Sequence, residues 1–176
     1  MTKYLFYYTL TICILSCSQA QSGNQKRILR TSIGNIKFDQ AITGFKFTTK
    51  IGNKYLYSPN GEKDIHNTHK TSGFYILAVP NIDNNSEHEY LLSFSDGFKE
   101  QKEIINIGED DIKVYNTKYG KATFVKFNVT YSSTEKGIAF QAIVSNGKNA
   151  VMFISEDHDN GKFIEKFQKT FESIEE

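Results

Sequence analysis

The stretch Gly161-Lys-Phe-Ile-Glu-Lys-Phe-Gln-Lys-Thr-Phe-Glu-Ser-Ile174 decides how the rest of this 176-residue chain must fold. Its large apolar residues recur at the spacing of one helical face, namely Phe163, Ile164, Phe167, Phe171 and Ile174. Asp159 or Asn160 is placed to cap this helix. So much aromatic surface has to pack on another apolar surface, and we expect that surface to be one face of a β-sheet.

Strand patterns lead up to this helix. Lys113 to Asn116 and Ile138 to Ser145 are predicted strands, and Phe127 and Val129 alternate with polar residues, as in an antiparallel strand with one buried face. Asn146-Gly147 predicts a tight hairpin, because both residues tolerate positive φ. Val151 and Phe153 belong to the strand that follows.

The earlier part of the domain is less regular. Gly73 to Val79 is a compact apolar run that predicts a strand. Phe45, Phe47 and Thr49 alternate with polar residues and predict another, half-buried strand. Ser86-Glu87-His88-Glu89 fits a capping box, so a second helix is predicted from about Glu87 to Gln101.

Three short motifs carry a resemblance to a known family. They are Tyr-Gly-Lys-Ala at 119–122, Gly-Lys-Asn-Ala-Val-Met-Phe at 147–153 and Phe-Gln-Lys-Thr-Phe-Glu-Ser-Ile at 167–174. With the long meander before them, they resemble the PsbP-like and DcrB-like α/β/α sandwiches. This group includes the PsbP extrinsic subunit of photosystem II, a Ran-binding nuclear import factor and bacterial envelope lipoproteins.

The resemblance covers about residues 36–175 and implies an α+β fold, an antiparallel β-sheet meander packed by helices. It also implies a binding or assembly role without catalysis. No binding residue of the family can be carried over, because no recognition motif matches at any position.

The N-terminal segment has the features of a targeting signal. Lys3 precedes an apolar run from Tyr4 to Leu15, which as a helix would span about 18 Å, short of the ~30 Å hydrocarbon core. A positive start, a short apolar run and small residues at its end are typical of a secretory signal peptide. Ile14-Leu15-Ser16-Cys17 resembles the bacterial lipobox, which implies cleavage before Cys17 and acyl chains on that residue.

Three segments follow from this interpretation: a lipoprotein signal peptide at 1–16, a lipidated Cys17 with a flexible linker at 17–35, and a PsbP-like domain at 36–176. Two or more acyl chains give a stable membrane anchor, so the domain would be tethered. Ser18 favours the outer membrane over the inner one, with the domain facing the periplasm. The alternative is a soluble secreted protein cut near Ala20.

The anchor also bears on cysteine chemistry and on charge. Cys13 would be discarded and Cys17 acylated, which leaves no free thiol. The mature chain would carry 20 basic and 20 acidic side chains. Lys26, Arg27 and Arg30 would add a few kcal/mol of attraction to anionic headgroups, which is secondary to the lipid.

Candidates for metal chemistry are weak. His66 and His69, with Asp64 as a third ligand, are the best metal-binding candidates, but they lie in a polar segment and we expect solvent-exposed histidines. The segment from Glu156 places Gly161 correctly for an EF-hand, but Phe167 stands where the bidentate Glu should be. No metal site and no cofactor are therefore expected.

Catalytic motifs are equally weak. Ser133-Thr-Glu-Lys136 has the spacing of a serine acyltransferase motif, but it falls in a predicted turn and its companion motifs are missing. No catalytic constellation is found, so an enzyme is not expected.

Function follows from these expectations. The formal charge of +1 offers no basic excess for phosphate backbones, so no nucleic-acid partner is expected. The sequence predicts a membrane-anchored envelope lipoprotein with a non-catalytic protein-binding or assembly role and an envelope protein as partner. The alternatives are a carrier of a small apolar ligand or lipid, and a hydrolase.

Overall fold

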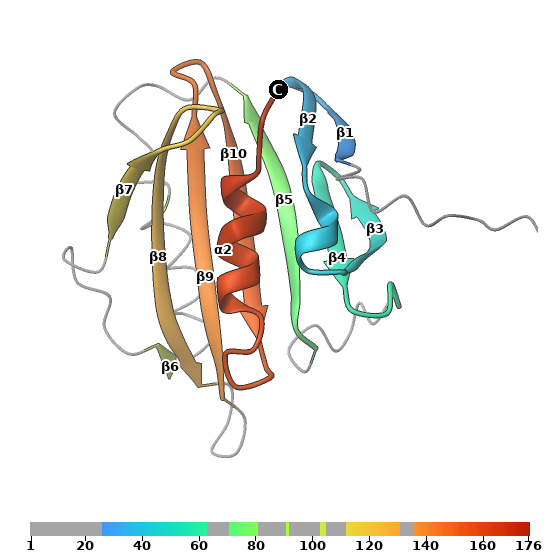
Figure 1. The fold of residues 1–176 in the computed structure, drawn as a ribbon, viewed down its shortest axis with the longest axis vertical. Helices are drawn as coiled ribbons and strands as arrows, with labels where there is room; N and C mark the ends of the chain where they lie inside the picture. Colours follow the sequence, from blue (N-terminus) through green and yellow to red (C-terminus); the bar gives the residue numbers. More distant parts are fainter. Residues whose placement is uncertain (1–25, 63–70, 81–90, 92–102, 105–111, 131–135) are drawn as a thin grey trace, which may run out of the picture.

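The computed structural model describes residues 26–62, 71–80, 91, 103–104, 112–130 and 136–176, and its centre is an eight-stranded antiparallel sheet (Figure 1). The strand order is β3-β4-β5-β10-β9-β8-β6, and β7 pairs with β8 outside this path. The strands are β3 (Lys46–Ile51), β4 (Lys54–Ser58), β5 (Gly73–Pro80), β6 (Glu103–Ile104), β7 (Lys113–Asn116), β8 (Lys121–Thr130), β9 (Lys136–Ser145) and β10 (Asn149–Asp157).

The centre of the sheet confirms the strands predicted in the C-terminal half and at Gly73 to Val79. The hairpin between β9 and β10 turns at Asn146-Gly147, where Gly147 has a φ of 86°. The Asn146 side chain closes this turn by accepting hydrogen bonds from the backbone N–H groups of Lys148 and Asn149. β5 lies on the other side of β10, so the last strand of the chain is central in the sheet.

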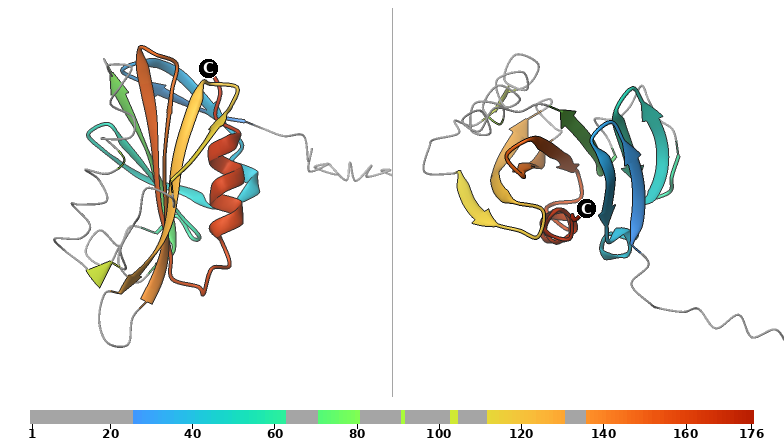
Figure 2. Two further views of the ribbon diagram at one scale, coloured as in Figure 1. Left: turned by 90° about the vertical axis from the view of Figure 1, so that its left-hand side faces the viewer. Right: turned by 90° about the horizontal axis from the view of Figure 1, so that it is seen from above.

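The C-terminal helix packs on one face of this sheet, as predicted. α2 (Ile164–Glu172) lies along β9 and β10 (Figures 1 and 2) and buries Ile164, Phe167 and Phe171. The Phe167 ring lies 5.9 Å from that of Phe74 on β5 and 6.5 Å from that of Phe153 on β10. We call these and their buried neighbours the aromatic layer: Phe38, Phe45, Tyr57, Phe74, Phe140, Phe153, Phe167 and Phe171.

The start of α2 corrects one prediction. Neither Asp159 nor Asn160 caps the helix; the N-cap residue is Phe163, which makes no side-chain capping bond. The buried carboxylate of Asp157 accepts from the backbone N–H groups of Asp159 and Phe163 instead. Asn160 has a φ of 57°, so it forms the turn before the helix and cannot stand at an extended cap position.

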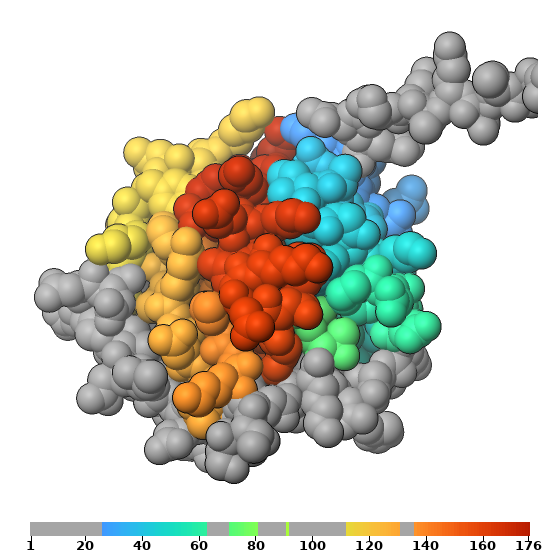
Figure 3. All heavy atoms as spheres, turned by 60° about the horizontal axis from the view of Figure 1, so that its bottom comes forward, coloured from blue at the N-terminus to red at the C-terminus, as the bar shows by residue number. Residues whose placement is uncertain are grey.

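The segment predicted as a linker is partly folded. β1 (Arg27–Thr31) and β2 (Gly34–Phe38) form an antiparallel hairpin, so residues 27–35 belong to the folded domain. Leu29, Ile36 and Phe38 alternate along the hairpin, and all three are buried in the aromatic layer or beside it. The 3-10 helix η1 (Gln40–Ile42) then leads to β3. Figure 3 shows this segment side by side with α2.

β3 differs from the predicted alternation at one point. Its register against β4 shifts between Phe47 and Thr49, where a bulge inserts one residue. Phe45 and Phe47 share one side of the strand, but the bulge turns Thr49 to the opposite side. Phe45 is buried, whereas Phe47 stays exposed although the Arg27 side chain of the hairpin lies over its ring.

The second face of the sheet is also apolar. Its buried residues include Leu77, Ile143, Met152 and Ile154. Leu91 packs against them, is fully buried and has helical backbone. The rest of the helix predicted from Glu87 to Gln101 lies outside the described residues. The described part is therefore broadly α+β, mostly antiparallel sheet with little helix.

Gly120 gives a physical reason for one of the motifs that carried the family resemblance. It ends the turn from Thr117, whose backbone N–H donates to the Gly120 carbonyl at 2.8 Å. A Cβ atom at position 120 would lie 1.9 Å from the carbonyl oxygen of Ser145. Tyr-Gly-Lys-Ala therefore marks a place where two chain segments approach too closely for any side chain.

The packing of the aromatic layer predicts how much stability is lost when one ring of α2 is removed. Phe167→Ala should lower the free energy of unfolding by about 3–5 kcal/mol, because it leaves a cavity among fully buried rings. Urea denaturation followed by circular dichroism measures this. Lys169→Ala, on the exposed side of the same helix, should cost less than about 1 kcal/mol. Equal losses for the two variants would contradict this packing.

Candidate functional site

Two open strand edges lie together on one side of the molecule. β3 ends the large sheet, and β1 is the strand of the hairpin farther from α2 (Figures 1 and 2). The Tyr55 hydroxyl donates to the carbonyl of Arg30, and the Arg27 guanidinium carbon lies 5.9 Å from the centre of the Phe47 ring. These contacts hold β1 over the edge formed by β3 and β4.

Cross-strand pairing explains which side chains gather there. Phe47 pairs with Tyr57 and Lys50 pairs with Tyr55, so all four point to the side of the sheet that the hairpin covers. The Lys50 ammonium lies 4.8 Å from the centre of the Tyr55 ring. We call the exposed side chains along this margin the β1–β3 surface: Arg27, Ile28 and Arg30 of β1, and Phe47 and Lys50 of β3.

The β1–β3 surface concentrates exposed apolar side chains. The described part of the chain has four large apolar side chains that are exposed: Ile28 (53%), Phe47 (40%), Ile51 (52%) and Val114 (57%). Two belong to the surface and Ile51 ends β3, whereas Val114 lies on β7, on the far side of the sheet. Apolar side chains grouped and bordered by charges are typical of contact sites.

The same region is strongly basic. Residues 26–62 contain seven Lys and Arg against two Asp and Glu, whereas residues 63–176 contain 13 against 18. Arg27, Arg30 and Lys50 form no ion pair with a carboxylate of a described residue, and neither do the neighbouring Lys46 and Lys54. Burial raises the pKa of Tyr57 to about 12, and the charge of the neighbouring Arg27 acts in the opposite direction, which shows that Arg27 lies close to this hydroxyl.

The edge of β3 is poorly suited to pairing with a further strand. Exposed Lys46 and Lys50, together with the bulge after Phe47, are devices that keep sheet edges from adding strands. The β1–β3 surface is therefore better suited to a broad charged contact than to an added strand.

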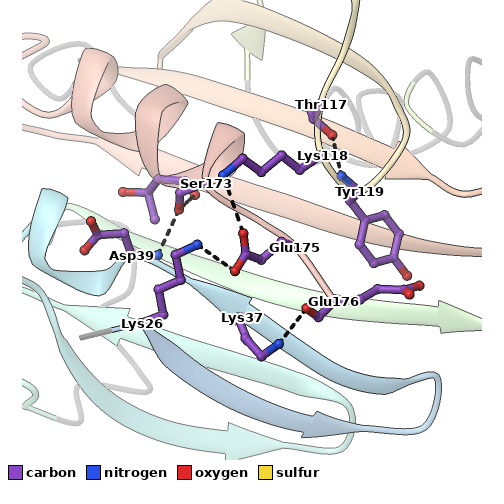
Figure 4. Close-up of polar contacts among 10 residues, drawn as sticks. Lys26, Lys37, Asp39, Thr117, Lys118, Tyr119, Ser173, Glu175 and Glu176 are labelled. Carbon is purple, nitrogen blue, oxygen red and sulfur yellow. Dashed lines mark hydrogen bonds and ion pairs between the residues drawn. The ribbon is translucent and has the colours of Figure 1, made fainter. Parts of the chain in front are cut away.

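The C-terminal tail fixes the hairpin in place (Figure 4). Lys37 and Glu175 form a β-bridge with backbone N···O distances of 2.8 and 2.9 Å. The Lys26 ammonium lies 2.6 Å from the Glu175 carboxylate, and the Asp39 backbone N–H donates to the Ser173 hydroxyl. The hydrogen bond from Lys26 lowers the pKa of the Glu175 carboxyl, with smaller contributions from the charges of Lys118 and Lys37. These contacts form the C-terminal clasp: Lys26, Lys37, Asp39, Ser173 and Glu175.

A polar group before α2 combines serine, histidine and carboxylate residues. The buried hydroxyl of Ser72 donates to the Asp159 carboxylate and accepts from the backbone N–H of His158. The His158 imidazole lies 3.4 Å from the Glu156 carboxylate. A nucleophilic serine is usually activated by an imidazole within hydrogen-bond reach of its oxygen, whereas the Ser72 hydroxyl donates to a carboxylate and accepts from a backbone amide. These residues order the turn between β10 and α2.

Several residues singled out in the sequence lie outside the described residues. They are Cys17, Asp64, His66, His69 and Ser133. Among the residues that are described, no three His, Cys, Asp or Glu side chains form a group that could hold a metal ion. No described helix has the length and apolar character needed to cross a bilayer.

No local motif in the sequence marks the β1–β3 surface, although one signal is present. Net neutrality of the whole chain conceals a division between a basic segment at 26–62 and an acidic remainder. Lys26, Arg27 and Arg30 are neighbours in the sequence and form a basic cluster on that ground alone. The pairing of β3 with β4 was needed to bring Phe47 and Lys50 beside them.

Comparison with known proteins establishes the fold alone. The sequence matches no family model and no curated protein sequence. Cyanobacterial PsbP from Synechocystis has a similar structure, with a TM-score of 0.55 and 9% identity over 92% of this chain and 98% of that protein. The Ran-binding protein Mog1p of Saccharomyces cerevisiae has a TM-score of 0.52 and 8% identity over 87% of this chain and 96% of Mog1p.

A Bacteroides thetaiotaomicron structure matches with a TM-score of 0.46 and 9% identity over 80% of this chain, which spans 44% of that protein. The neighbours with TM-scores above 0.5 support a PsbP-like fold, as the motifs had suggested.

The clasp predicts a pH-dependent contribution to stability. A carboxyl whose pKa is lowered by folding stabilises the protein above its ordinary pKa of 4.5, and this contribution is lost as the pH falls through the lowered value. Glu175→Gln should therefore lower the melting temperature at pH 7, and the difference from the wild type should vanish in more acidic solution. Thermal denaturation between pH 2 and pH 7 measures this. A difference that stays constant down to pH 2 would contradict the ion-pair assignment.

Proposed function

We propose that this chain is a lipid-anchored protein of the bacterial cell envelope with a non-catalytic, protein-binding or assembly role. The observation that carries the proposal is Ile14-Leu15-Ser16-Cys17 at the end of a short apolar run. Acylation of Cys17 would hold the domain on the periplasmic side of a membrane, with the outer membrane favoured by Ser18.

Two observations support binding in place of catalysis. One structural neighbour is a Ran-binding protein, and another is a PsbP protein, so the fold is found in a protein named for binding another protein. In the described part of the chain, Ser72, Asp157 and Asp159 are engaged in the turn before α2. The proposed partner is an envelope protein, because an anchor at Cys17 would hold the domain at the membrane.

The two alternatives receive less support. A carrier of an apolar ligand would hold it between sheet and helix, but α2 meets the sheet through closely packed rings, including the pair Phe153 and Phe167. A serine hydrolase usually activates its serine with an imidazole, whereas the buried Ser72 hydroxyl donates to the Asp159 carboxylate and accepts from the backbone N–H of His158, within the turn before α2. No cofactor and no nucleic acid enter the proposal.

Metabolic labelling tests the anchor. Cells grown with labelled palmitate should incorporate label into the wild-type protein, and Cys17→Ala should abolish incorporation because the acylated residue is missing. Cys13→Ala is the matched control and should keep the label, because this residue lies in the discarded peptide. An unlabelled wild-type protein would overturn the lipid anchor.

Cross-linking in intact cells tests the binding role. A tagged wild-type protein should recover one partner in stoichiometric amount. A control lipoprotein, with residues 1–25 fused to an unrelated domain, should not recover it. Recovery of the same protein by both, or of none by the wild type, would count against a protein-binding role.

A further inference from the structure

We infer that the β1–β3 surface lies on the anionic headgroup layer of the bilayer that holds the lipid anchor. The anchored domain then has one preferred orientation and does not tumble freely on its tether. This inference rests on the proposed lipid anchor and adds to it a surface, a ligand chemistry and an orientation.

The first support is the short tether. Cys17 and Lys26 are nine residues apart, and a fully extended chain spans at most ~3.3–3.6 Å per residue. Lys26 therefore stays within about 32 Å of the acylated residue. β1 begins at the next residue, Arg27, so the β1–β3 surface is at the end of the domain closest to the anchor along the chain.

The second support is charge complementarity. Arg27 and Arg30 on β1 and Lys50 on β3 are exposed and form no ion pair within the described residues. Lys46 and Lys54 lie at the same edge but on the other face of the sheet, where the Lys54 ammonium is 5.6 Å from the centre of the Tyr75 ring, so the docking charge is that of Arg27, Arg30 and Lys50. Phosphate groups of anionic lipids attract such a cluster, and the attraction is confined to about a Debye length from the surface.

The third support is the mixture of cationic and apolar side chains. Ile28 and Phe47 are exposed among the cations, and the Arg27 guanidinium lies over the Phe47 ring. An aromatic ring with a cation beside it is suited to the boundary between headgroups and acyl chains. An acidic extended peptide would be the other polyanionic occupant, but Lys46 and the bulge after Phe47 oppose its addition to β3 as a strand.

A site-specific fluorescent probe tests this in the acylated full-length protein. The mature chain would contain no cysteine besides the acylated Cys17, so an introduced cysteine can be labelled selectively. Ile28→Cys places an environment-sensitive dye on the β1–β3 surface, and Val114→Cys places it on β7 at a site of similar exposure. Both proteins are reconstituted into vesicles of phosphatidylglycerol and phosphatidylcholine, or of phosphatidylcholine alone.

The dye at position 28 should shift to shorter emission wavelengths and be quenched by spin-labelled lipid in anionic vesicles only. The dye at position 114 should keep its aqueous spectrum in both. About 1 M salt should reverse the shift at position 28, because it shortens the Debye length to ~3 Å. Equal spectra at the two positions in a protein confirmed to be acylated would overturn the orientation while leaving the anchor intact. Failure of palmitate labelling would overturn the anchor itself.

Charge variants supply the matched comparison. Replacing Arg27, Arg30 and Lys50 together by Gln should weaken docking on the order of tenfold to a hundredfold, read from the fraction of dye that shifts. Replacing Lys121, Lys148 and Lys162 by Gln removes the same charge from other exposed positions and should leave docking unchanged. Equal losses of docking for the two triple variants would overturn the assignment of the β1–β3 surface to the headgroup layer. A dye shift at position 28 that soluble polyglutamate causes and anionic vesicles do not would also overturn it.

Discussion

The rest of the structure depends on covering one wide aromatic face of a sheet with two separate elements. α2 has nine residues, so it is about 13.5 Å long, and its diameter of about 10 Å covers roughly two strands spaced ~4.8 Å apart. It lies over β9 and β10, and it cannot also shield Tyr57 on β4. The β1–β2 hairpin supplies the missing cover through Leu29, Ile36 and Phe38. The aromatic layer joins both covers through Phe74 of β5, whose ring contacts Phe38 of the hairpin and Phe167 of α2.

Because α2 and the β1–β2 hairpin each cover part of the aromatic face, one part of the fold could be predicted from the sequence and the other could not. Phe167, Phe171 and the Asn146-Gly147 turn belong to local patterns, so α2 and the strands before it were predictable from spacing alone. The hairpin was missed because Leu29, Ile36 and Phe38 are isolated apolar residues in a basic, polar context, and their burial depends on β4 and α2, distant in sequence. The cap of α2 was misassigned because Asp157 reaches it from the end of a strand, two residues before the expected position.

The β1–β3 surface could not be predicted from the sequence for a different reason. Its charges could be counted in the sequence, but their grouping depends on the bulge in β3, which brings Lys50 to the side of Phe47 and Tyr55 and turns Thr49 away. No local pattern indicates that bulge. The hairpin in turn carries Arg27 to a position over Phe47. The hairpin that completes the core therefore also helps to assemble the exposed basic and apolar margin, so its folding and its surface chemistry are linked.

The C-terminal clasp has a mechanical consequence for a domain held at its N-terminus. Tension on such a domain enters at Lys26, next to a two-stranded hairpin that could be peeled away one bond at a time. The ion pair from Lys26 to Glu175 and the bridge from Lys37 to the same residue pass this load to the end of α2, whose rings are locked into the central strands. A pull on the N-terminus of such a domain would thus be resisted by α2, which buries Ile164, Phe167 and Phe171.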